Sequence, residues 1–140
     1  MCIPLALREM RRPSSGVQTM TLPLTPEMLA AAYDFLLVTK PFCDWNLEDS
    51  EDVKFVVGKF RNDYAQYQWD GKRHVITISA HGIGYTRTLF EKLSHELIHL
   101  HLENTGMESR TGGKDTHNAA FRKFAARVCR YHGFDPKAFY

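Results

Sequence analysis

Five consecutive residues, His95-Glu96-Leu97-Ile98-His99, have the types and spacing of a zinc hydrolase site. On a helix, residues four apart lie on one face, so the two imidazoles can bind the same metal ion. Glu96 lies about 100° from His95 around the helix, where its carboxylate can address a water on the metal. Zinc with three protein ligands lowers the pKa of a bound water to about 7. The pattern therefore predicts Zn2+ as cofactor, His95 and His99 as metal ligands, and Glu96 as general base.

The third ligand must come from outside this pentapeptide. His101 cannot share the ion with His99, because residues two apart on a helix lie about 200° apart, and we interpret His101 as a surface or hydrogen-bonded histidine. Glu103 and Glu108 would suit a His-His-Glu site, but Glu103 is one further helical turn away and Glu108 falls in a loop.

His117 is the favoured third ligand. A helix start at Asp115-Thr116 would place it in a first turn, facing the same side as an apolar stripe made of Ala120, Phe121, Phe124, Ala125 and Val128. A histidine on this buried face would meet the helix that carries the motif. The alternative is a histidine that bonds only to a backbone carbonyl.

The motif needs a helix to position it, and the flanking sequence predicts one. Thr88 and Glu91 fit a capping box at its start, and Gly106 fits the left-handed residue that follows a helix end. Apolar residues recur at spacings of three and four on the side opposite His95, at Phe90, Leu93, Leu97 and Leu100. A helix apolar around most of its girth is buried, so its imidazoles and carboxylate require partners.

The remaining segments predict an α+β fold with three main helices and a small sheet. Thr25 and Pro26 begin an amphipathic helix that ends before Pro41. Residues 53–60, 64–69 and 74–79 read as strands, with a turn at Asp70-Gly71, and we expect all three to be antiparallel. Residues 1–22 are predicted to be a flexible tail, and residues 23–140 a single domain.

The motif, a short loop and then His117 with Phe121 four residues later resemble the SprT-like zinc metalloprotease domain, a family that includes the Spartan-type proteases. The resemblance covers roughly residues 53 to 133. It implies a zincin-like fold with the motif helix central, zinc ligands at His95, His99 and His117, Glu96 as catalytic base and a polypeptide substrate. Asn118 stands where the family usually has glycine, and the cysteine-rich zinc ribbon of many bacterial members has no counterpart.

The resemblance also bears on how a substrate would be held. It implies that the strand Val75–Ser79 could line the cleft and bind an extended substrate by strand addition. His81 and Tyr85, in the glycine-containing loop that follows, are candidates for stabilising the oxyanion.

Composition restricts the setting and the partners. Cys2, Cys43 and Cys129 are isolated and odd in number, which indicates no disulfide framework and favours a cytoplasmic location. No apolar run is long enough to span a membrane. The net charge of +2 does not imply a polyanionic partner, although basic residues cluster near the C-terminus at Arg122, Lys123, Arg127 and Arg130. The alternative function is a non-catalytic, zinc-stabilised binding module that contacts DNA or a DNA-bound protein through this basic helix.

Overall fold

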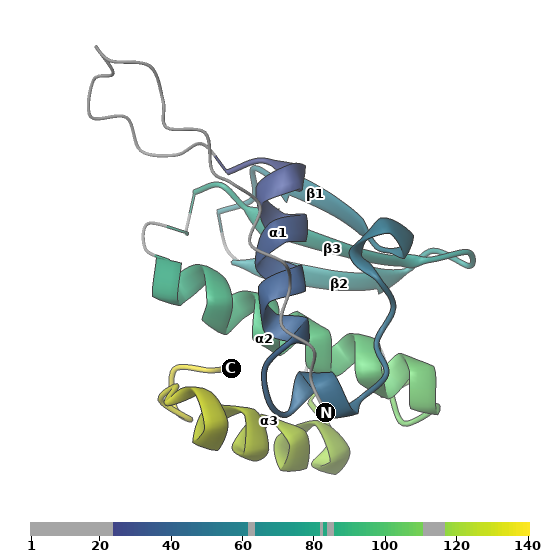
Figure 1. The fold of residues 1–140 in the computed structure, drawn as a ribbon, viewed down its shortest axis with the longest axis vertical. Helices are drawn as coiled ribbons and strands as arrows, with labels where there is room; N and C mark the ends of the chain where they lie inside the picture. Colours follow the sequence, from purple (N-terminus) through teal and green to yellow (C-terminus); the bar gives the residue numbers. More distant parts are fainter. Residues whose placement is uncertain (1–23, 62–63, 82, 84–85, 111–116) are drawn as a thin grey trace.

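A mixed three-stranded sheet forms one layer of the fold (Figure 1). The computed structural model describes residues 24–61, 64–81, 83, 86–110 and 117–140, so the predicted tail lies outside the described residues. The strands are β1 (Lys54–Gly58), β2 (Ala65–Trp69) and β3 (His74–Ser79), in the order β1-β3-β2. The α+β class with three helices and a small sheet is therefore confirmed.

The predicted all-antiparallel sheet is wrong for one of its two pairings. β2 and β3 form an antiparallel hairpin, whose turn is held by Asp70, with Gly71 at a φ of +93°. β1 instead pairs in parallel with the far edge of β3. The reason is that β3 lies between β1 and β2, which run in opposite directions, so it must be parallel to one of them. As expected of a central strand, its residues His74, Ile76, Ile78 and Ser79 are all buried. Strand order depends on such tertiary packing, not on order in the chain.

The central place of β3 changes which strand lies at the free edge. Val75–Ser79 was the strand expected to bind an extended substrate, yet both of its edges are paired. In the described part of the chain, the edge strands are β1 and β2, and β2 is the edge strand that contacts α2.

Helix α1 (Pro26–Leu37) begins as predicted, with the Thr25 side chain accepting a hydrogen bond from the Met28 N–H at 3.1 Å. Helix α2 (Thr86–Thr105) carries the motif and contacts α1, β2, β3 and α3 (Figure 1). It starts before Thr88, so the predicted capping box is wrong. Its burial is as predicted, because every residue from Leu93 to Leu102 is buried.

Helix α3 (Ala119–His132) packs against α2. The predicted start at Asp115-Thr116 lies outside the described residues. Helix α3 begins at Ala119, where the Asn118 side chain caps it by accepting the Phe121 N–H at 2.9 Å, so His117 precedes the helix and is not in its first turn. Its basic residues Arg122, Lys123, Arg127 and Arg130 are exposed, as expected of a solvent-facing side. The buried apolar residues of the helices and the sheet form one core cluster.

Two further features bear on the setting of the protein. In the described part of the chain no helix is both long and apolar enough to cross a membrane. Cys129 is buried and free. The cytoplasmic location therefore stays a prediction.

Candidate metal centre

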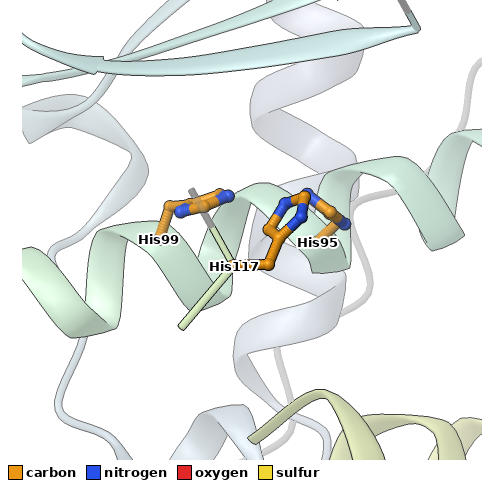
Figure 2. A group of neighbouring side chains, drawn as sticks. All are labelled: His95, His99 and His117. Atoms are coloured by element: carbon orange, nitrogen blue, oxygen red, sulfur yellow. The ribbon is translucent and has the colours of Figure 1, made fainter. Parts of the chain in front are cut away.

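Three histidines from two segments converge on one point (Figure 2). His95 and His99 project from the same face of α2. His117 is the residue just before Asn118, the N-cap of α3, and its side chain lies beside the other two. The Nε2 atoms of His117 and His95 lie 3.0 Å apart, and one ring nitrogen from each of the three histidines lies within 4.8 Å of the others. Three imidazole nitrogens are a donor set that suits zinc. The histidines therefore form a group that could hold a metal ion.

Hydrogen bonds at Nδ1 orient the two candidate metal ligands on α2, His95 and His99. His95 Nδ1 lies 2.9 Å from the backbone carbonyl oxygen of Phe139, and His99 Nδ1 lies 2.9 Å from Glu108 Oε2. A carbonyl or carboxylate oxygen can only accept, so in both rings Nδ1 carries the proton. Each Nε2 then keeps its lone pair for a metal.

Burial favours the neutral, metal-binding form of His95 and His117. His95 is only 9% exposed, and burial, followed by the nearby imidazole of His99, lowers its pKa to about 3. Burial also lowers the pKa of His117. Phe121 packs against all three rings, with centroid distances of 4.4 to 4.8 Å. Neutral imidazoles in an apolar surround need no proton release before they coordinate a metal.

The histidine group opens into a cleft of about 710 Å³ between α2 and the edge strand β2. Glu96 lines this cleft together with His95, His99 and His117, although it is only 4% exposed. Tyr140 forms part of the wall and its ring lies 5.5 Å from that of His117. The other lining residues are Tyr64, Ala65, Gln66, Tyr67, Gln68, Trp69, Lys92, Glu103, Glu108 and Ser109.

Two other candidates from the sequence, His101 and His81, do not line the cleft. His101 is buried rather than exposed, and its ring stacks on Trp45 with centroids 4.4 Å apart. Its Nδ1 has no hydrogen-bond partner among the described residues, so the surface or hydrogen-bonded interpretation is not supported for that atom. His81 is exposed and is not among the residues that line the cleft, and Tyr85 lies outside the described residues.

Sequence reasoning missed two groups that contact the histidines. The carbonyl of Phe139 leaves no signature in side-chain patterns, since any residue supplies a carbonyl. Glu108 was visible as a candidate ligand, but the structure places it at His99 Nδ1, on the ring edge that faces away from a metal at Nε2.

Comparison with protein-family models gives no match for this chain, and comparison with curated protein sequences gives none either.

Proposed function

We propose that the protein is a zinc-dependent metallopeptidase of the SprT-like, zincin-like type, with α2 as its central helix. The single observation that carries the proposal is the histidine group beside Glu96 in an open cleft. Among the described residues this group has three members, which leaves a position for a water and a substrate carbonyl. A structural zinc site usually has four protein ligands, so the count favours catalysis over the binding-module alternative.

The roles of the side chains follow from their chemistry. His95, His99 and His117 would hold the zinc through Nε2. When bound, zinc would lower the pKa of a water to about 7 and polarise the scissile carbonyl. Glu96 takes a proton from the attacking water and then delivers it to the leaving amine.

The edge strand supports a polypeptide as the substrate. The Tyr64 carbonyl accepts the Ser79 N–H at 2.8 Å, and the Asp70 N–H reaches the Arg73 carbonyl at 3.3 Å. In an antiparallel pair, bonded residues alternate with residues whose N–H and C=O point to the opposite edge. The outward-facing set is therefore Ala65, Tyr67 and Trp69, all of which line the cleft. An extended peptide could pair with these groups beside Glu96. From the sequence, this substrate-binding role was expected of Val75–Ser79.

The basic side of α3 keeps DNA, or a protein bound to it, as a proposed partner. Its exposed cations would contact phosphates, so DNA should bind more weakly as salt rises. The assay below is therefore run with and without DNA.

The test combines zinc content with hydrolysis of an unfolded protein substrate. Glu96→Gln should keep zinc, because the carboxylate is not a ligand, and should lose about 10²-fold or more of the activity. Glu27→Gln makes the same chemical change at an exposed position on α1 and serves as the control. Wild type that binds no zinc, or full activity in Glu96→Gln, would remove the proposal. Zinc binding without hydrolysis, with or without DNA, would favour the binding module.

A further inference from the structure

We propose that Glu108 is a positioning residue of the metal centre, which holds the His99 imidazole in the tautomer and orientation that bind zinc. The inference rests on the proposed zinc site and assigns Glu108 no contact with metal or substrate. The carboxylate acts through the imidazole it contacts.

The geometry around Glu108 fixes both of its carboxylate oxygens. Oε2 lies 2.9 Å from His99 Nδ1, and the two side chains are 12% and 11% exposed. Oε1 accepts the N–H of Ser109 at 3.1 Å. A carboxylate held at both oxygens and mostly shielded from water forms a stronger and better-directed hydrogen bond than a mobile surface acid.

The end of α2 places Glu108 under His99. Gly106 takes a left-handed conformation, with a φ of +73°, and the Met107 N–H bonds back to the Leu102 carbonyl at 2.8 Å. The Gly106 N–H bonds to the Glu103 carbonyl at 3.3 Å, which completes a Schellman motif. This motif reverses the chain, so the residue after Met107 returns alongside the helix it has just left.

Asn118 ties this loop to the segment that carries the third histidine. Its Nδ2 donates to the Met107 carbonyl at 2.9 Å, while its Oδ1 caps α3. Asn118, next to His117 in the chain, therefore binds Met107, which is next to Glu108. Asn118, which departs from the glycine usual in the resembled family, thus has a defined structural part here.

The two candidate metal ligands on α2 differ in the charge of their Nδ1 partner. His95 donates to a neutral carbonyl and His99 to a carboxylate. A carboxylate partner raises the basicity of the imidazole and stabilises the positive charge of a bound metal. Glu108 should therefore strengthen metal binding as well as orient the ring.

The experiment measures zinc affinity of the full chain by competition with a chromophoric chelator, for wild type, Glu108→Ala and Glu108→Gln. Losing a partner of this kind weakens metal binding roughly 10- to 100-fold, and this is the loss expected for Glu108→Ala. A glutamine oxygen can still accept the His99 N–H, so Glu108→Gln should recover part of that affinity. The visible spectrum of the cobalt-substituted protein should change in Glu108→Ala and return toward wild type in Glu108→Gln.

The matched controls are Glu103→Ala and Glu103→Gln. Glu103 lies near the same end of α2 and pairs with Arg110 at 3.5 Å, so its substitution removes the same charge without removing the partner of His99. These controls should keep wild-type zinc affinity within about twofold, against the loss of tenfold or more at Glu108.

The outcomes separate the two proposals. Zinc-binding wild type with unchanged affinity in Glu108→Ala would overturn the role of Glu108 and leave the metal site standing. Equal losses at Glu103 and Glu108 would overturn it too, since charge alone would then explain the effect. Wild type that binds no zinc would overturn both proposals. If Glu108→Ala fails to fold, Glu108→Gln decides the question. A zinc affinity and a cobalt spectrum that are both the same in Glu108→Gln as in Glu103→Gln would overturn the positioning role of Glu108.

Discussion

Acid should destabilise the metal-free protein through His95, because the folded state holds this imidazole neutral. Its pKa falls from 6.5 to about 3, and burial is the largest cause. The unfolded chain has no such surround, so there the imidazole takes up a proton near pH 6.5. Between these two values the unfolded state binds more protons than the folded state, so stability rises with pH. The contribution of neutral His95 to the stability of the folded state is fully present above about pH 7.5 and is lost progressively as the pH falls from 6.5 toward 3.

The size of the effect follows from the shift. Between pH 6.5 and about pH 5, His95 is protonated in the unfolded chain and neutral in the folded chain, and this interval spans about 1.5 pH units. At about 1.4 kcal/mol per unit, the metal-free protein should lose about 2 kcal/mol of unfolding free energy through this one side chain.

The assay is denaturant unfolding in a chelator at about pH 7.5 and about pH 5, for wild type and His95→Gln. Glutamine does not titrate, so the variant should lose about 2 kcal/mol less than wild type between the two conditions, whatever its stability at neutral pH. Comparing the two changes cancels contributions from histidines that do not contact His95, such as His132, whose pKa is also lowered. An equal pH dependence in the two proteins would show that His95 is not held neutral, and the account of its burial would be wrong.

Three further perturbations test the elements around the site. Gly106→Ala should lower the free energy of unfolding by about 1 kcal/mol, because alanine is strained at a φ of +73°. Chelator competition should also show weaker zinc binding, because Glu108 shifts, and unchanged stability would contradict the Schellman motif. Tyr67→Phe should cost about 1–3 kcal/mol in denaturant unfolding, since it removes the hydroxyl that contacts buried His74 Nδ1; a neutral result would mean that this contact is not made. Leu97→Ala should cost about 2–5 kcal/mol, because this side chain is fully buried on the face of α2 opposite His95, and a loss below 1 kcal/mol would be inconsistent with that packing.

Local patterns in the sequence predicted the features that depend on neighbouring residues. The caps Thr25 and Gly106, the turn at Asp70-Gly71 and the buried character of α2 each follow from side-chain types within one or two turns of chain. The same local reasoning failed at Thr88, because α2 begins at Thr86, and it did not select the Asn118 cap of α3.

The convergence of the site is only partly local. The spacing of His95, Glu96 and His99 places them together once a helix forms, so sequence alone was enough to select them. The choice of His117 over Glu103 and Glu108 required an assumption about how two helices pack, and the structure brings His117 to the others.

Tertiary structure alone decided which strand borders the cleft and what lies behind the histidines. β3 is central, with its backbone paired on both edges, and β2 is at the edge, an order that does not follow the order of the strands in the chain. Glu108 and the Phe139 carbonyl reach the imidazoles through a helix-end reversal and the packing of a distant segment. The sequence thus determined the donor atoms available for a metal, whereas the packing of distant segments determined their orientation and the cleft they face. Donor chemistry resides in single side chains, but orientation and access are properties of contacts between residues far apart in the chain.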